Sequence, residues 1–267
     1  MIELTIFTVA TGRYLDFWIQ LVKSGEEYIG NSVKTQWLVL TDQGGKIPKE
    51  LVDELGPRLS IVSIDHELWP YPTLKRYEYL LSARDQIVSE YVMHLDADMI
   101  FIDSINEQDI TKPLAHSEIA CVSHPGYFRP KGFKLFFFYL KNPRRIFQDV
   151  SLLLKFGGVG TWERNSKSTA FVERPKRNIY VCGGCWFGNT GKILQMALSL
   201  ERNVNIDLEN GLIANFHDES HLNSFVSSND VNIITPEFCF EPKYPQLRGL
   251  RGKILAVDKN VQGKWLR

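Results

Sequence analysis

The sequence predicts an α/β fold with a mixed, mostly parallel central sheet flanked by helices. Three observations carry this prediction. Short apolar runs alternate with amphipathic segments through the first half of the chain, glycine-containing turns separate several of them, and 44% of the 267 residues are hydrophobic while 23% are charged. Strand–helix alternation is typical of parallel sheets that are covered by helices on both faces. The composition also excludes a disordered chain and a fibrous repeat.

The expected strands are short runs of apolar and β-branched residues. The first, at 4–9, ends where Thr11-Gly12 breaks the pattern, and the second, at 36–41, ends at Asp42-Gln-Gly-Gly45. The remaining strands are expected at 59–64, 91–95 and 253–257.

The expected helices carry apolar residues three and four positions apart, which places these residues on one face. The clearest is 14–28, with Leu15, Trp18, Ile19 and Val22 on that face. The other helices are expected at 48–55, 74–88, 192–201 and 217–225.

One domain covering 1–267 is expected, because the chain contains no internal repeat and no low-complexity linker. Its length lies within the range of a single large α/β domain. The 31 Lys and Arg residues balance 31 Asp and Glu residues. A nucleic-acid polymer requires an excess of positive charge on the protein that binds it, so the balance excludes that class of partner.

The sequence carries no sign of membrane insertion or export. A membrane span needs roughly 18 apolar residues, whereas the longest apolar run, Leu135–Leu140, has six. The N-terminus carries Glu3 and lacks the basic region of a signal peptide. Four cysteines in a chain of this length do not make a disulfide framework. We therefore expect a soluble, cytoplasmic protein with reduced thiols.

Asp96-Ala97-Asp98 directly follows the strand expected at 91–95. Ligands of open α/β sheets bind at the carboxyl ends of strands, and a turn there would direct both carboxylates to one point. Hard oxygen ligands suit Mn²⁺ or Mg²⁺, which keep bound waters and take substrate phosphate oxygens as further ligands. The position favours a divalent-metal site over the alternative of two solvated loop carboxylates.

The segment 216–223 reads FHDESHLN and places His217 and His221 on one helical face. A zinc hydrolase of the HExxH type needs glutamate directly after the first histidine, but Asp218 stands there. The spacing therefore argues against zinc. Two adjacent carboxylates, Asp218 and Glu219, beside two histidines indicate a functional site. The alternative is a polar helix N-terminus whose carboxylates accept hydrogen bonds from free backbone amides.

Cys182-Gly-Gly-Cys185 matches the C-x-x-C spacing. A zinc knuckle needs a second pair, and Cys121 and Cys239 are isolated, while a thioredoxin-like motif would come early in the chain at a helix start. We interpret the segment as structural, with Gly183 and Gly184 leaving room for a ligand to approach the backbone.

Taken together, these motifs occur in an order that resembles glycosyltransferase family 6, which contains the histo-blood-group A and B transferases and α1,3-galactosyltransferase. The resemblance covers nearly the whole chain, and the string HDESHLN is its most specific part. The motifs are Phe7…Tyr14, Thr73-Leu-Lys-Arg76, Asp96-Ala-Asp98, His124-Pro-Gly126, Thr161-Trp-Glu-Arg164, Ser168-Thr-Ala170, Gly183-Gly184 and His217-Asp-Glu-Ser-His-Leu-Asn223.

The resemblance implies a GT-A fold, with nucleotide-sugar binding in 1–115 and acceptor binding and catalysis in 116–267. It implies a retaining hexosyltransferase that moves N-acetylgalactosamine (GalNAc) or galactose from a UDP-sugar to the 3-hydroxyl of a galactoside in α linkage. The metal would be Mn²⁺ or Mg²⁺. The absence of the vertebrate members' stem and anchor points to a microbial or phage-type member. A UDP-sugar hydrolase and a non-catalytic glycan or nucleotide-sugar binding module are the alternatives.

The resemblance also assigns roles to individual residues. Glu219 matches the catalytic glutamate, and Asp96 and Asp98 match the metal ligands. The positions that match donor contacts are Phe7, Val9, Tyr14, Arg76, Asp96, Ala97, Asp98, Cys182, Gly183, Gly184, Asp218 and Lys259. The positions that match acceptor contacts are His124, Thr161, Phe216 and Glu241.

The chemistry of these residue types agrees with transfer. Cleavage of a sugar–phosphate bond builds negative charge on the diphosphate, which a divalent ion and Lys259 would stabilise, and positive charge on the sugar, which Glu219 would stabilise or attack. Cys182-Gly183-Gly184 is small throughout, and family members with glycine at the Gly184 position tend to accept GalNAc. UDP-GalNAc is therefore the expected donor in preference to UDP-galactose.

The chain departs from the family between His124 and Thr161, where 36 residues replace a short connector. The inserted segment spans about 129–155, and its part 129–145 holds six basic residues, no acidic residue and a cluster of aromatics. One hypothesis is an amphipathic element that contacts a membrane surface or an anionic acceptor. The other is that the aromatics pack on the domain while the basic side chains remain solvated.

Overall fold

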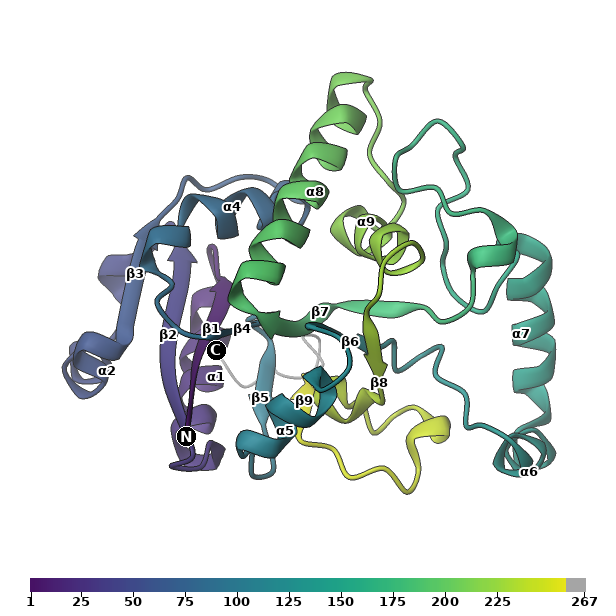
Figure 1. Ribbon diagram of the computed structural model, residues 1–267, viewed down its shortest axis with the longest axis horizontal. Coiled ribbons are helices and arrows are strands. Elements are labelled where there is room, and N and C mark those ends of the chain that lie inside the picture. The colour runs from purple at the N-terminus through teal and green to yellow at the C-terminus, as the bar shows by residue number, and fades with distance from the viewer. Residues whose placement is uncertain (258–267) are drawn as a thin grey trace.

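The computed structural model describes residues 1–257, and its core is a seven-stranded mixed sheet (Figure 1). A separate two-stranded sheet lies beside it. The strands of the large sheet are β1 (Ile2–Val9), β2 (Val33–Thr41), β3 (Leu59–Ser63), β4 (Tyr91–Leu95), β6 (Ile119–Ser123), β7 (Val181–Asn189) and β8 (Asn232–Ile234). The small sheet pairs β5 (Met99–Phe101) with β9 (Ile254–Ala256).

The order of the large sheet is β3-β2-β1-β4-β7-β6-β8. Strands β3, β2, β1 and β4 are mutually parallel, and β8 is parallel to β6. Strand β7 runs antiparallel to both of its neighbours, β4 and β6. The predicted mixed, mostly parallel α/β sheet is therefore confirmed, and the β4–β7 pairing joins the two halves of the sequence in one sheet.

Helices cover both faces of the large sheet and extend beyond its edge. They are α1 (Tyr14–Tyr28), α2 (Lys49–Leu55), α3 (Tyr71–Leu74), α4 (Arg76–Ser82), α5 (Glu107–Thr111), α6 (Phe133–Lys141), α7 (Pro143–Phe156), α8 (Thr190–Glu209) and α9 (His217–Val226).

Alternation of side chains along the strands builds two apolar layers. In β2, Trp37 and Val39 enter the layer that α1 and α2 cover, whereas Leu38 and Leu40 enter the layer that α4, α8 and α9 cover. Figure 1 shows α4, α8 and α9 together on one side of the sheet. Both faces of the central strands are buried, which explains why these strands read as continuous apolar runs rather than as alternating patterns.

Most expected elements agree with the structure, and one is partly wrong. The helix expected at 14–28 is α1, and the helix expected at 217–225 is α9 with one more residue. The helix expected at 74–88 is instead the short helices α3 and α4, because the chain leaves the helix at Ala83 and passes through one 3₁₀ turn into β4.

Strand β7 escaped prediction because its glycines are typical of a loop. Every residue of β7 except Asn189 is buried, since β4 and β6 flank it on either side. Burial in a sheet centre overrides the weak strand preference of glycine.

The inserted segment forms α6 and α7, which lie at the edge of the molecule opposite α2 (Figure 1). Of its aromatic residues, Phe138 is buried, but Phe133, Phe136 and Phe137 are exposed. The hypothesis that the aromatics of this segment pack on the domain is therefore wrong for most of them.

The four cysteines are buried and form no disulfide, which agrees with the structural interpretation of Cys182 and Cys185. None of the helices within residues 1–257 combines the length and the apolar character that a membrane crossing requires.

Candidate active site

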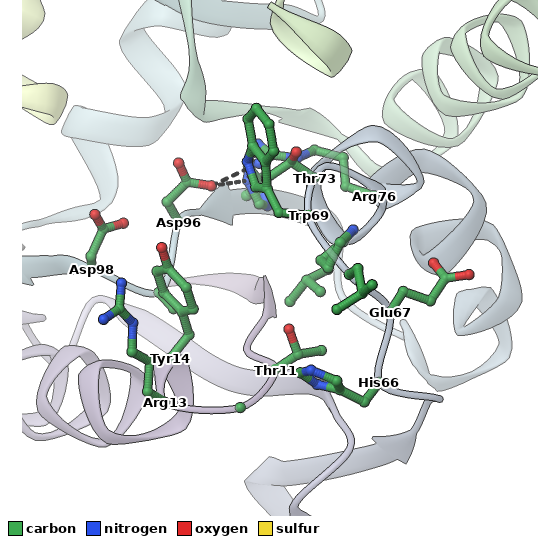
Figure 2. A pocket seen from close by; sticks show the side chains of 16 residues that line it. Thr11, Arg13, Tyr14, His66, Glu67, Trp69, Thr73, Arg76, Asp96 and Asp98 are labelled. Atoms are coloured by element: carbon green, nitrogen blue, oxygen red, sulfur yellow. Dashed lines mark hydrogen bonds and ion pairs between the residues drawn. The ribbon is translucent and has the colours of Figure 1, made fainter. Parts of the chain in front are cut away.

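A cavity of about 320 Å³ opens at the carboxyl ends of β1 and β4. Its walls come from residues 9–14 after β1, from the segment 66–73 and from the turn 96–98 after β4. Figure 2 shows the labelled side chains of these three segments around the opening. The position is the one where open α/β sheets bind their ligands.

Arg76, the first residue of α4, is the centre of the polar network in this cavity. It is 4% exposed. Its Nη2 donates to Asp96 Oδ1 at 2.9 Å, a contact drawn in Figure 2, and its Nε lies 3.1 Å from Asp218 Oδ2 in an ion pair. Its Nη1 donates to the Gly183 carbonyl at 2.7 Å. One guanidinium thus connects α4, the turn after β4, β7 and α9.

Arg76 stays positively charged although its side chain is buried. Burial opposes the charged form, but the nearby carboxylates of Asp218 and Asp96 outweigh it and raise the pKa of Arg76. An arginine is suited to such a position because its planar donors reach several acceptors at once.

His94, in β4, contacts the guanidinium of Arg76. Its Nε2 lies 2.7 Å from Arg76 Nη1, and its Nδ1 lies 3.2 Å from the Phe7 carbonyl oxygen. Burial, and then repulsion by Arg76, lower the pKa of His94 to about 4. The ring is therefore neutral at pH 7. Because a guanidinium only donates, these partners assign an Nε2 that accepts and an Nδ1–H that donates to Phe7.

Asp218 and Glu219 lie in the first turn of α9, at the inner edge of the network. Burial raises the pKa of Asp218 to about 7, although Arg76 acts in the opposite direction. Burial likewise raises the pKa of Glu219 to about 7. Hydrogen bonds from the Gly183 amide and the Tyr180 hydroxyl lower this pKa and so oppose the effect of burial. The Gly183 amide donates to Glu219 Oε2 at 2.9 Å. Two adjacent buried carboxyl groups that titrate near neutrality are typical of acid–base and nucleophilic sites.

Two of the glycines of β7, Gly183 and Gly184, allow the carboxyl groups to approach the sheet. A Cβ at Gly184 would lie 2.8 Å from Asp96 Oδ2 and 2.8 Å from the Met99 methyl group. A Cβ at Gly183 would lie 3.1 Å from Asp218 Oδ2. The room that the sequence led us to expect at these glycines is thus occupied by the site's own carboxylates.

His217, which precedes the two carboxyl residues, has a left-handed backbone with φ of 46°. Only a few per cent of non-glycine residues adopt this conformation, which is concentrated at functional sites. Its ring contacts Trp69 edge-on, with 4.6 Å between ring centroids. The contact connects the start of α9 to the cavity segment 66–73.

The residues predicted to contact the donor fall into three groups. Six of them line the cavity, whereas Gly183, Gly184 and Asp218 contact the Arg76 network at its inner side. Phe7 and Cys182 are buried in the two apolar layers, and Lys259 lies outside the described residues. The six that line the cavity are Val9, Tyr14, Arg76, Asp96, Ala97 and Asp98.

The structure does not bring the Phe7 side chain to the cavity. It is completely buried between the sheet and α4, because it stands on the opposite side of β1 from Ile6. Its carbonyl holds His94 instead. Thr11, which was expected only as part of the break after the first strand, also lines the cavity.

Two of the predicted acceptor residues, His124 and Thr161, meet at a cluster of aromatic rings. The His124 ring lies 4.6 Å from that of Tyr127 and 6.0 Å from that of Tyr180. The Tyr180 hydroxyl lies 3.5 Å from the Thr161 carbonyl and also bonds Glu219. The cluster is therefore continuous with the catalytic candidate.

The other two acceptor candidates are Glu241 and Phe216. Glu241 acts electrostatically on His124, raising the pKa that burial lowers to about 4. Phe216 is 40% exposed and precedes α9. The acceptor roles of all four residues stay predictions.

Sequence reasoning missed three parts of the site. His94 interrupts an otherwise apolar strand, and Tyr180 directly precedes the glycine strand, so each carried a weak signal. The segment 66–69 gave none. Trp69 is 73% exposed at the mouth of the cavity, and Glu67 is held by Lys75 Nζ at 2.6 Å and by the Tyr79 hydroxyl at 2.7 Å.

Comparison with known proteins identifies the class of this site. A sequence model of glycosyltransferase family 6 matches residues 158–267. Globoside alpha-1,3-N-acetylgalactosaminyltransferase 1 of Homo sapiens is 24% identical over 268 residues, covering 97% of this chain and 67% of the relative. The O-antigen biosynthesis glycosyltransferase WbnI of Escherichia coli is 23% identical over 257 residues, covering 96% of this chain and 94% of the relative.

The chain is similar to glycosyltransferase family 6. Histo-blood group ABO system transferase 1 of Rattus norvegicus is similar to the same extent, at 24% identity over 98% of this chain and 67% of the relative. The protein is accordingly a hexosyltransferase, and its sheet has the GT-A-like arrangement that the resemblance implied.

Arg76→Met should destabilise this enzyme in a pH-dependent way. At about pH 8 we expect the free energy of unfolding to fall by about 3 kcal/mol, because the substitution leaves the buried carboxylate of Asp218 unpaired. The loss should shrink at about pH 5.5, where Asp218, with its pKa near 7, is already protonated in the folded state. Urea unfolding at the two pH values measures both losses.

The double variant Arg76→Met/Asp218→Asn provides the control. It should recover most of the lost stability at high pH, since the unpaired carboxylate is gone. An equal loss at both pH values, or no recovery in the double variant, would show that Asp218 does not depend on Arg76.

Proposed function

We propose that this enzyme moves GalNAc, or galactose, from a UDP-sugar to the 3-hydroxyl of a galactoside with retention of the α configuration. The observation that carries the proposal is the pair Asp218 and Glu219. Both are held at a pKa of about 7 beside a cavity that Asp96 and Asp98 line. Each role below rests on the position of the residue together with the family resemblance.

The lining of the cavity combines apolar and charged groups, which suits a nucleotide-sugar donor. Val9, Tyr14, Trp69 and Pro72 offer apolar and aromatic surface for a base and ribose. The same lining carries charged groups, with Arg13 and Tyr14 beside Asp98 in Figure 2. Mostly apolar walls with a few convergent polar groups are typical of small-molecule sites.

The residues present fit a divalent metal ion. Asp96 and Asp98 offer carboxylate oxygens to one cavity, and within residues 1–257 no group of three or more His, Cys, Asp or Glu side chains is arranged to hold an ion by itself. Mn²⁺ and Mg²⁺ bind through one or two carboxylates and complete their shell with water and substrate phosphates. When bound, such an ion neutralises charge on the departing diphosphate.

Glu219 is the group that we assign to the anomeric carbon. The Gly183 amide and the Tyr180 hydroxyl fix its carboxylate, whereas Asp218 is committed to Arg76. As the sugar leaves the phosphate, an ionised Glu219 stabilises the positive charge on the ring carbon or forms a bond to it. Asp218 would accept a hydrogen bond from a donor-sugar hydroxyl while its charge stays balanced by Arg76.

The aromatic cluster at His124, Tyr127 and Tyr180 supports an acceptor site for a sugar. It lies on the same side as Glu219, because Tyr180 contacts both. Burial lowers the pKa of His124 to about 4, so its ring is neutral, and its Nδ1 accepts the Gly126 amide at 3.0 Å. The other ring nitrogen is therefore an N–H donor suited to a sugar oxygen.

GalNAc is the donor sugar that we favour. The small residues Gly183 and Gly184 line the inner side of the site, and the relative from Homo sapiens carries alpha-1,3-N-acetylgalactosaminyltransferase in its name. A larger side chain at Gly184 would press on Asp96 and displace its carboxylate from the site.

Glu219→Gln should separate binding from transfer. We expect UDP binding to be retained and transfer to fall by a factor on the order of 10² or more. The pKa of Glu219 is raised on folding, so its contribution to stability is present at acidic pH and lost as the pH rises through about 7. The variant should therefore be at least as stable as the wild type at about pH 8, which calorimetry tests.

Glu209→Gln, an exposed glutamate at the end of α8, is the matched control and should change neither property. Near-normal transfer by Glu219→Gln would remove Glu219 from the reaction. A marked loss of its stability would indicate a structural role instead.

The proposal as a whole is tested by turnover of UDP-GalNAc and UDP-galactose with and without a panel of galactosides. We expect transfer that requires Mn²⁺ or Mg²⁺ and is faster with UDP-GalNAc. EDTA, or the double variant Asp96→Asn/Asp98→Asn, should abolish it because the carboxylate ligands of the ion are removed. Undiminished transfer in EDTA would refute the metal role, and UDP release that no galactoside accelerates would identify a hydrolase.

A further inference from the structure

The α6–α7 helix pair, residues 133–156, presents its apolar side chains to the outside. On α6, the exposed residues recur at intervals of three and four, which makes them one continuous stripe. Their exposed fractions lie between 45% and 77%. The members of this α6 stripe are Phe133, Phe136, Phe137 and Leu140.

Helix α7 repeats the arrangement. Its apolar residues also follow helical spacing, and their exposed fractions lie between 43% and 77%. The members of this α7 stripe are Ile146, Phe147, Val150, Leu153 and Leu154.

The opposite sides of the two helices hold them to the protein. Phe138 and Phe156 are buried, and Asp149 is buried beneath Arg129, whose Nε donates to it at 2.6 Å. The Tyr139 hydroxyl donates to the same carboxylate at 2.7 Å. The helices are therefore anchored by their polar and inner residues, with the apolar stripes directed away. Exposed apolar clusters of this extent mark interaction surfaces.

Positive charge accompanies both stripes. Residues 129–156 contain one carboxylate, Asp149, which is buried and paired with Arg129. Five basic side chains are exposed, and no carboxylate among residues 1–257 forms an ion pair with any of them. They are Lys131, Lys134, Lys141, Arg144 and Lys155.

We propose that the α6–α7 helix pair docks on the surface of an anionic lipid bilayer. The Phe and Leu stripes would enter the boundary between headgroups and acyl chains, and the lysines and arginine would lie over the anionic headgroups. Amphipathic helices that combine aromatic and leucine residues with basic ones bind membranes in this way. Charge complementarity decides against a second copy of the chain, since self-association through this face would bring like charges together.

The inner side of the α6–α7 helix pair connects the proposed docking surface to the candidate acceptor site. A second cavity, of about 490 Å³, lies between α7 and the loop after β6, and Tyr127 lines it together with Arg145 and Leu152. Tyr127 also belongs to the aromatic cluster beside Glu219. Docking would therefore place the acceptor side of the site next to the headgroup layer.

Sedimentation of the full chain with vesicles tests the proposal without any activity measurement, so its failure is distinguishable from failure of the proposed function. We expect binding to phosphatidylcholine vesicles that contain about 30% phosphatidylserine, and about tenfold or weaker binding to phosphatidylcholine alone. Added salt should weaken the binding because it screens the headgroup charge.

Two variants test the apolar residues and the basic residues of the α6–α7 helix pair separately. Phe136→Ser/Phe147→Ser/Leu154→Ser removes apolar area, and Lys134→Glu/Lys141→Glu reverses charge. Each should lower vesicle affinity about tenfold or more. The matched controls Val88→Ser/Leu198→Ser and Lys23→Glu/Lys49→Glu alter exposed residues elsewhere and should bind like the wild type.

Unchanged thermal unfolding would confirm that each variant is folded, as expected for residues that are mostly exposed. No binding by the wild type, or equal binding by all variants, would overturn the proposal. It would equally be overturned by a dimer of the wild type in light scattering that the triple serine variant abolishes, since a second copy would then cover the stripes.

Discussion

The contact of one buried guanidinium with two carboxylates is the interaction on which the active site depends. Arg76 reaches Asp96 and Asp218 at the same time, and His94 and the Gly183 carbonyl fix it in place. Four elements that are distant in sequence meet at this side chain. Because an arginine keeps its charge even when buried, it can hold carboxylates at a depth where they would otherwise be neutral.

The network around Arg76 contains more carboxyl groups than cationic groups. Asp96, Asp218 and Glu219 lie close to one buried guanidinium, that of Arg76, and burial, with repulsion between these carboxylates as a smaller cause, raises the pKa of Asp218 and Glu219 to about 7. Such a site gains stability from any positive charge that enters it. In the proposed reaction, a divalent ion at the diphosphate and the developing charge on a sugar ring would be two charges of that kind, and a preorganised field of this sign would favour both. The same excess of negative charge lowers the stability of the folded protein. Such a loss of stability is common at functional sites.

Sequence patterns predicted the first half of the sheet well, because β1, β2 and β4 are buried runs and α1 has a clear apolar face. They also located Asp96, Asp98, Asp218 and Glu219, whose types and order are specific. They missed what depends on long-range packing. The glycines of β7 look like a loop until two neighbouring strands bury them, and Phe7 enters the core because of the side of β1 on which it stands. Nothing local distinguishes segment 66–69, since its role comes from contacts with α4 and α9.

The pH dependence of kcat/KM for sugar transfer, measured on the wild type and on Tyr180→Phe, tests the role of the buried carboxyl pair. The wild type should lose activity as the pH falls, with an apparent pKa of about 7, because Glu219 must be ionised. Removing the Tyr180 hydroxyl takes away a hydrogen bond that lowers this pKa, so the acidic limb should move to higher pH. Tyr139→Phe, whose hydroxyl bonds Asp149 on the α6–α7 helix pair, should leave it in place. A flat profile across this range, or a limb that Tyr180→Phe does not move, would contradict a reacting Glu219.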